Sequence, residues 1–269
     1  MSTEHTTVSP AQPLRILIAE DNPVNMMVAV TILNRVLPGA TILEAANGVE
    51  AVEKYNESRP DLVFMDLQMP DRNGFDATEI IRKTDPAAQI PIIAITASDM
   101  KEERERCLEL GMNDFLHKPF VENAMIALLK KWIHPSAAEI QTITPDIQSS
   151  DSQHFNIAIL KQYLSADIIG YTFLLEIMEA TITELRKLSS QIWQHDEQWE
   201  DTDLKRIGHK LYGTATTVGL MELSRMAADM QVNPGTPGEQ QKLLLTQLKE
   251  ELDYCIHLLE ESTAHLRYG

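Results

Sequence analysis

The sequence predicts two folded parts of different class: an α/β part with a doubly wound, five-stranded parallel sheet, and an all-α four-helix bundle. Three observations lead to this prediction. The 269 residues are enough for two domains of ordinary size. The first half alternates short apolar runs with helical patterns. The second half instead repeats apolar residues at spacings of three and four, as amphipathic helices do.

Five short apolar runs mark the expected strands of the first half. Each run ends at polar or turn-forming residues, and such runs are typical of strands that are buried on both faces of a parallel sheet. The runs lie at residues 14–19, 41–45, 62–66, 91–96 and 114–117.

A helical pattern follows each run. Pro23 suits the first turn of a helix that ends near Pro38, and Asn47 is a typical N-cap for the next helix. Alternating strands and helices imply right-handed crossovers, which bring the carboxyl ends of all five strands to one edge of the sheet. The three later helices are expected at about 75–83, 100–110 and 121–132.

The second half carries four amphipathic series, which suggest an antiparallel four-helix bundle with a short covering helix at about 155–164. The apolar positions are Leu174, Met178, Ile182, Leu185, Leu188 and Ile192; Leu204, Ile207, Leu211, Ala215 and Val218; the segment 220–230; and Leu245, Leu248, Leu252, Cys255 and Leu259. We therefore expect a leader at 1–13, an α/β domain at 14–134, a linker at 135–153 and a helical bundle at 154–269.

Composition narrows the possible functions. The net charge is −17 and neither half carries a basic stripe, so we expect no nucleic-acid binding. No stretch is long and apolar enough for a membrane span, and the first residues lack a signal-peptide core. The two cysteines, Cys107 and Cys255, fit helical core positions in a reducing compartment, so a cytoplasmic location is expected.

Polar residues follow four of the predicted strands, where parallel strands share one edge. Glu20 and Asp21 follow the first strand, Asp66 ends the third, Thr96 ends the fourth and Lys118 follows the fifth. A lone aspartate at a strand end is commonly a cap or solvated, but this joint arrangement indicates a site. Several carboxylates with room for water and phosphate suit Mg²⁺.

These residues, in this order and spacing, make residues 14–134 resemble a response-regulator receiver domain, which has a flavodoxin-like fold. The resemblance implies that Asp66 accepts a phosphoryl group. It implies that Asp21, Asp66 and the backbone carbonyl of Gln68 bind Mg²⁺, while Glu20 holds a metal-bound water. The resemblance further implies that Thr96 and Lys118 contact the phosphoryl group and that the Lys118-Pro119 peptide is cis. It also implies a switch in which Thr96 moves inward and Phe115 rotates. The alternative for Phe115 is a plain core role.

His209 is the informative residue of the second half. It lies two positions from Ile207 and two from Leu211, so it points away from the core stripe of its helix. Its neighbours on that face are Lys205, Tyr212, Gly213 and Thr216. A glycine beside a histidine would let a partner approach closely, although periodicity alone also fits an idle surface histidine.

Residues 204–220 resemble the motif of a histidine phosphotransfer (HPt) domain, usually His-x-Leu-Lys-Gly-Ser. The match covers His209, Leu211, Gly213, Thr214 and the later Gly219. It implies that His209 accepts and donates a phosphoryl group. Tyr212 stands where the family usually has lysine, so Lys210 or Lys205 would take over part of its role, or the tyrosine hydroxyl would donate a hydrogen bond.

The whole chain therefore resembles a two-component phosphorelay protein, such as the C-terminal part of a hybrid sensor kinase. The resemblance implies Mg²⁺ as cofactor, and a sensor histidine kinase or another receiver as partner. We see no kinase ATP-binding motif in the sequence. The rival interpretation is a phosphorylation-controlled interaction switch with a vestigial His209, and a weaker rival is a phosphate sink that hydrolyses phospho-Asp66.

Overall fold

The computed structural model describes residues 13–86, 90–97, 101–133, 154–156, 159–160, 168–194, 201–232 and 239–268. The predicted leader, apart from its last residue, and the predicted linker from 135 to 153 lie outside these residues, as does most of the expected helix at 155–164. Among the described helices, none combines the length and apolar content needed to cross a membrane.

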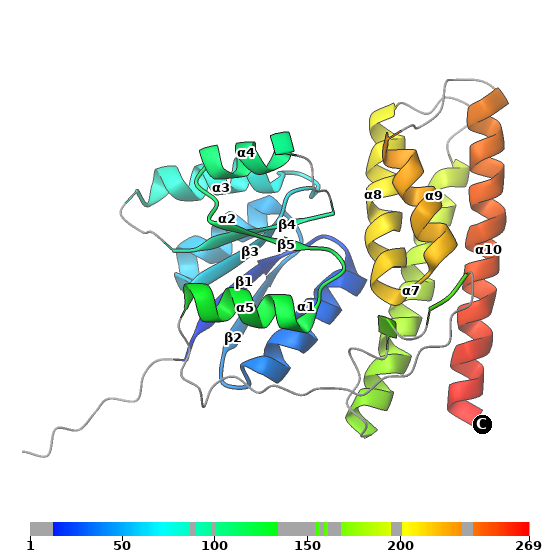
Figure 1. Cartoon of the computed structure of the whole chain (residues 1–269), viewed down its shortest axis with the longest axis horizontal. Helices are drawn as coiled ribbons and strands as arrows, with labels where there is room; N and C mark the ends of the chain where they lie inside the picture. The colour runs from blue at the N-terminus through cyan, green and yellow to red at the C-terminus, as the bar shows by residue number, and fades with distance from the viewer. Residues whose placement is uncertain are drawn as a thin grey trace, which may run out of the picture.

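The first part contains the expected five-stranded parallel sheet, in the order β2-β1-β3-β4-β5 (Figure 1). β3 and β4 are buried along their whole length, as their apolar sequences predict. All five carboxyl ends lie at one edge of the sheet. The strands are β1 Arg15–Ala19, β2 Thr41–Ala45, β3 Leu62–Asp66, β4 Ile92–Thr96 and β5 Asp114–His117.

Helices cover both faces of this sheet, and strand residues alternate between the two cores. Ile16, Ile18 and Phe64 pack on the side of α1 and α5, whereas Leu17 and Val63 pack on the side of α2, α3 and α4. The prediction of a doubly wound α/β fold is therefore confirmed. The helices are α1 Pro23–Val36, α2 Gly48–Ser58, α3 Gly74–Thr84, α4 Lys101–Glu109 and α5 Glu122–Trp132.

Asparagine side chains begin three of these helices. Asn22, Asn47 and Asn73 are the N-caps of α1, α2 and α3, and each side-chain oxygen accepts hydrogen bonds from backbone N–H groups of the first turn. Two of these caps follow strand ends closely, so capping fixes the chain just where the polar edge of the sheet begins.

The described residues of the second part form a bundle of four helices, as the apolar spacing predicts. The predicted apolar positions, including Leu185, Leu211 and Leu252, are buried in its core, except Leu245, which is partly buried. Gly219, at a φ of +85°, turns the chain between α8 and α9, and an added Cβ would lie 2.4 Å from the carbonyl oxygen of Asn156. The helices are α7 Ile168–Gln194, α8 Asp201–Val218, α9 Met221–Val232 and α10 Glu239–Tyr268.

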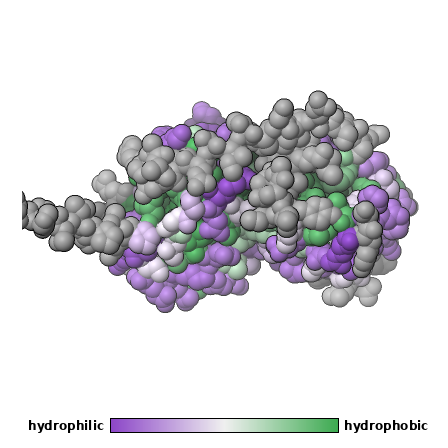
Figure 2. Space-filling view, turned by 90° about the horizontal axis from the view of Figure 1, so that it is seen from below, coloured by the Kyte–Doolittle hydropathy of each residue, from purple (hydrophilic) through white to green (hydrophobic). Residues whose placement is uncertain are grey.

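The bundle packs against the edge of the α/β part where the strands end. In Figure 1, α8 runs past the carboxyl ends of the sheet, and α1 contacts both α7 and α8. Buried apolar residues of α1 and of the bundle belong to one continuous core. Figure 2 shows many hydrophilic side chains on the coloured outer surface of both parts.

Candidate functional site

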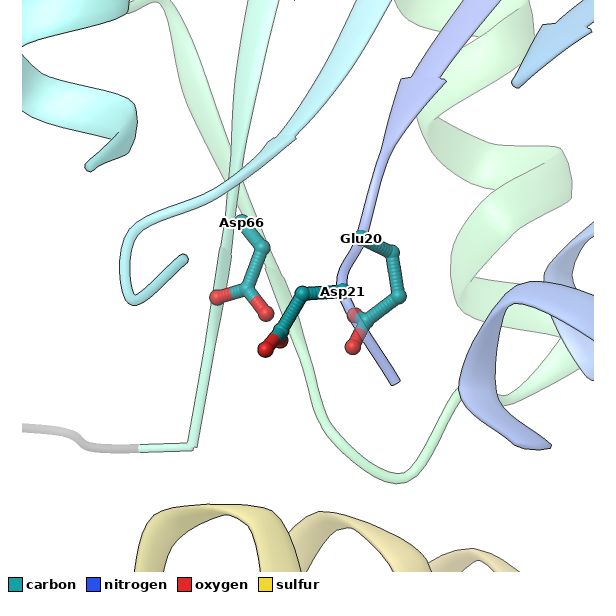
Figure 3. Close-up of side chains that lie close together, drawn as sticks. All are labelled: Glu20, Asp21 and Asp66. Carbon is teal, nitrogen blue, oxygen red and sulfur yellow. The ribbon is translucent and has the colours of Figure 1, made fainter. Parts of the chain in front are cut away.

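Three carboxylates meet at the edge of the sheet that faces α8. β1 leads into Glu20 and Asp21, and the neighbouring strand β3 ends at Asp66. Their ligand oxygens lie within 4.8 Å of one another (Figure 3). Such a set of oxygen donors fits a hard divalent cation. The sequence-based expectation that the topology brings these residues together is correct.

Lys118, just after β5, lies among the carboxylates. Its ammonium donates to Asp66 Oδ2 at 2.6 Å and lies 2.8 Å from Glu20 Oε2. The peptide between Lys118 and Pro119 is cis, as expected. Burial alone would lower the pKa of Lys118, but attraction to Asp66 and Glu20 outweighs it and raises that pKa, so the lysine is charged.

Glu20 is the least solvated of the three acids. Burial, together with repulsion from Asp66 and Asp21, raises its pKa to about 8, although Lys118 opposes the shift. Glu20 Oε1 also accepts hydrogen bonds from the backbone N–H of Asn22 and from the Asn25 side chain, at 3.2 Å each. Hydrogen bonds from the first residues of α1 therefore fix this carboxylate.

The two residues expected to act as a switch have specific partners. The Thr96 hydroxyl donates to Glu103 Oε1 of α4 at 2.5 Å, so in this structure it points to α4. Phe115 is half-buried, and the Arg104 guanidinium lies 4.4 Å from the centre of its ring. Whether either residue moves on phosphorylation stays a prediction.

His209 of α8 faces this edge of the sheet. Its side chain lines a narrow cavity together with Asp66, Thr96, Glu103 and Gln231. Only 6% of the residue is exposed, and its Nε2 atom is buried without a hydrogen-bond partner. The prediction that His209 points away from the bundle core is confirmed, but it is not an idle surface residue, because the α/β part covers it.

Gln231 of α9 orients the imidazole. The Gln231 amide nitrogen donates to the carbonyl oxygen of Ala227 at 3.5 Å, which turns its oxygen toward His209 Nδ1 at 3.4 Å. That oxygen can only accept, so Nδ1 carries the proton and Nε2 keeps its lone pair. The unprotonated nitrogen is buried, and His209 shares a cavity with Asp66.

We predict that His209 titrates below the usual 6.5. Burial lowers its pKa, Asp66 raises it again in part, and Lys118 lowers it further. The folded chain therefore keeps the imidazole neutral. Because the unfolded chain already binds this proton near pH 6.5, the free energy of unfolding decreases as the pH falls from 6.5 through the lower pKa of the folded chain. Nitrogen-15 NMR of the histidine ring should show this pKa. It should rise when Gly213→Leu separates the two parts; an equal pKa in both proteins would contradict the prediction.

Four further contacts join α8 to the site. The Lys210 ammonium lies 2.5 Å from Asp21 Oδ2. The Asn22 amide donates to Thr214 Oγ1 at 2.7 Å and to the Lys210 carbonyl at 3.3 Å. The Thr217 hydroxyl donates to Asn25 Oδ1 at 2.7 Å. These bonds cross between segments almost 200 residues apart, and they fix the register of α8 against α1.

Gly213 permits this close approach. A Cβ added to it would lie 2.8 Å from Asn25 Nδ2, closer than real Cβ atoms come. Asn25 is only 1% exposed and is bonded at both ends of its amide, to Glu20 and Thr217. The expectation that this glycine admits a partner is therefore correct, and the partner in this structure is α1 of the same chain.

The other expected residues of the α8 surface lie apart from the carboxylates. Lys205 is exposed, and Tyr212 is half-buried and packs against the apolar core. Sequence reasoning missed Asn22, Asn25 and Gln231. The capping position of Asn22 before Pro23 was a usable signal, whereas Gln231 lies 22 residues from His209 and has no local pattern that marks it.

Comparisons with known proteins show what the chain is similar to. The profile of the response regulator receiver domain matches residues 16–130. The chain is 28% identical over 258 residues to the aerobic respiration control sensor protein ArcB of Escherichia coli K12, covering 93% of this chain and 32% of ArcB. It is 26% identical over 243 residues to the signal transduction histidine-protein kinase BarA of the same organism, covering 89% of this chain and 26% of BarA.

A solved structure is also similar. It is the receiver domain of the sensor histidine kinase PA1611 from Pseudomonas aeruginosa, with a magnesium ion coordinated in its active site cleft. The identity is 37%, the match covers 46% of this chain and 99% of that one, and the TM-score is 0.42. This chain spans about a third or less of the length of the two sensor proteins.

Proposed function

Because residues 16–130 are a response regulator receiver domain, we propose that this chain is a phosphorelay protein in which Asp66 and His209 exchange a phosphoryl group. In this proposal residues 14–134 are the receiver and residues 154–269 are a histidine phosphotransfer domain. A sensor histidine kinase supplies phosphoryl groups to Asp66, or another receiver takes them from His209.

One observation carries the proposal: His209, whose buried Nε2 atom has no hydrogen-bond partner, and Asp66 line the same small cavity. Phosphoryl transfer needs the donor, the phosphorus and the acceptor in line, with little other covalent chemistry from the protein. In transfer from Asp66, a bond forms between Nε2 and phosphorus while the bond from phosphorus to the aspartyl oxygen breaks. Asp66 leaves as a carboxylate, and the proton stays on His209 Nδ1, which faces the Gln231 side-chain oxygen.

The carboxylates Glu20, Asp21 and Asp66 fit Mg²⁺, which prefers a few carboxylate oxygens and keeps part of its water shell. Such an ion would offset negative charge on the phosphoryl oxygens when bound. Lys118 is a fixed positive charge beside Asp66 and supports the same oxygens. Thr96 is buried at the neighbouring strand end, where its hydroxyl can bond a phosphoryl oxygen after leaving Glu103.

The test is to follow radiolabel from acetyl phosphate in the full chain with Mg²⁺. Label on Asp66 is lost in base, whereas label on His209 is lost in acid and resists base. We expect both kinds of label in the unaltered chain, base-labile label alone in His209→Gln, and none in Asp66→Asn. Mixing the two variants shows how much transfer occurs between molecules. Base-stable label in Asp66→Asn, or none in the unaltered chain, would refute the proposed exchange.

A further inference from the structure

Lys210 holds one of the three carboxylates from the opposite side of the domain interface. Its ammonium lies 2.5 Å from Asp21 Oδ2, and the Asp21 and Lys210 side chains are only 4% and 20% exposed. An ion pair so shielded from water is stronger than a surface pair. Asp21 follows β1, whereas Lys210 lies on α8, directly after His209. The bundle thus places a positive charge on a proposed metal ligand of the receiver.

Two lysines therefore offset much of the negative charge of the acidic site in this structure. Lys118, from the receiver itself, pairs with Asp66 and Glu20, and Lys210, from the bundle, pairs with Asp21. A divalent cation bound to the carboxylates would lie within a few ångströms of both ammonium groups. Like charges at that separation repel each other, more strongly in a buried site than in water. Lys118 is fixed by its own domain, but Lys210 can leave if α8 or its side chain moves.

We propose that Lys210 and Mg²⁺ compete for Asp21, so that metal binding weakens the docking of α8 and docking weakens metal binding. This inference rests on the metal site of the proposed function and adds a regulation to it. Linkage requires that the two effects be equal in size. The Asn22–Thr214 and Asn25–Thr217 hydrogen bonds are not part of the competition. Docking is therefore loosened rather than abolished, and transfer between Asp66 and His209 stays possible.

The competition gives the magnesium ion a second effect. Without metal, the docked state covers His209, whose buried ring is closed to any other receiver. With metal, α8 separates more often, and His209 becomes available to a second receiver. The lysine next to the phosphotransfer histidine thus decides how often the histidine is released.

Mg²⁺ affinity of the full chain, measured by titration calorimetry, tests the first half of the proposal. Lys210→Met should bind Mg²⁺ about five- to tenfold more tightly than the unaltered chain, the usual size of coupling between two sites. Lys210→Arg should restore the lower affinity because it keeps the charge. Lys205→Met is the matched control, since Lys205 lies on the same helix but is exposed, and its affinity should not change. Equal affinities in Lys210→Met and Lys205→Met would overturn the competition.

Docking is measured separately, without phosphoryl chemistry, by electron–electron resonance between spin labels. Asn56→Cys on α2 and Leu243→Cys on α10 offer exposed label positions, while Cys107 and Cys255 are buried. Mg²⁺ should broaden the distance distribution in the unaltered background and leave it unchanged in Lys210→Met. A distribution that narrows with Mg²⁺ would overturn the inference. If Mg²⁺ binds as expected here but no label reaches His209, the exchange fails and the competition stands.

Discussion

Replacing Gly213 by leucine is expected to slow phosphoryl transfer from Asp66 to His209 by about 100-fold, the cost typical of a displacement of about 1 Å at the reacting atoms. A Cβ at this position already meets Asn25 Nδ2 at 2.8 Å. Asn25 cannot turn aside without losing its bonds to Glu20 and Thr217. The larger side chain must therefore push α8 away from α1. Phosphorylation of Asp66 by acetyl phosphate should continue, and rapid-quench labelling separates the two steps.

Two further variants isolate the cause of this effect. Gly213→Ala should strengthen the helix by about 1 kcal/mol, because alanine is the better helix former, yet still slow the transfer. A stabler bundle with slower transfer points to docking rather than folding. Gly39→Leu is the control, since nothing lies within 4 Å of a Cβ at that glycine. Unchanged transfer in Gly213→Leu would mean that the docked arrangement is not the reactive one.

The receiver site could be predicted from sequence because the order and direction of the strands largely determine where its residues lie. Once five apolar runs alternate with helices, parallel pairing places residues such as Asp66 and Lys118 at one edge, whatever the detail of packing. Helical periodicity likewise put His209 on the side of α8 opposite the bundle core. Both inferences use a regular pattern, the alternation of strands and helices or the helical period, and such patterns are visible in the sequence.

The contacts between the two parts follow no such period. Asn22 and Thr214 lie 192 residues apart, and either residue alone is an ordinary cap or helix residue. Periodicity could show that α8 has a free face, but not that α1 covers it. The same holds for Lys210: the sequence predicts Lys210, Lys205 or Tyr212 as a support for the phosphoryl group, but it does not show that the Lys210 ammonium pairs with Asp21. Charge complementarity across an interface becomes visible only when both surfaces are placed.

Tyr212 bears on the rival interpretation of a vestigial histidine. The usual lysine of that position is missing, but the site does not lack positive charge, because Lys118 and Lys210 both contact its carboxylates. Gln231 still fixes the tautomer of His209. A neutral, oriented histidine that shares a cavity with Asp66 fits the proposed transfer better than an idle remnant.

Lys118→Met is expected to lower the free energy of unfolding of the receiver by about 3 kcal/mol in EDTA, the cost of removing one partner of a buried ion pair. The lysine side chain is 2% exposed and supplies the positive charge for both Asp66 and Glu20. Without it, the pKa of Glu20, already about 8 in the unaltered chain, should rise further, because Lys118 is the charge that opposes the shift. Mg²⁺ should recover part of the loss by binding the freed carboxylates. Urea unfolding with and without Mg²⁺ measures both quantities.

The same variant should accept phosphoryl groups on Asp66 about 100-fold more slowly, because a fixed charge beside the transferred oxygens is lost. Lys131→Met provides the comparison, since Lys131 pairs with Asp114 at 2.7 Å but its side chain is 60% exposed. An exposed pair contributes about 1 kcal/mol or less, so this second variant should keep nearly all of its stability and its phosphorylation rate. If Lys118→Met proved as harmless as Lys131→Met, the buried lysine would be neither the counter-charge of the acidic site nor a support for the phosphoryl group. The two lysines form ion pairs of similar length. The difference between the two variants in stability and in phosphorylation rate therefore measures what burial contributes to this site.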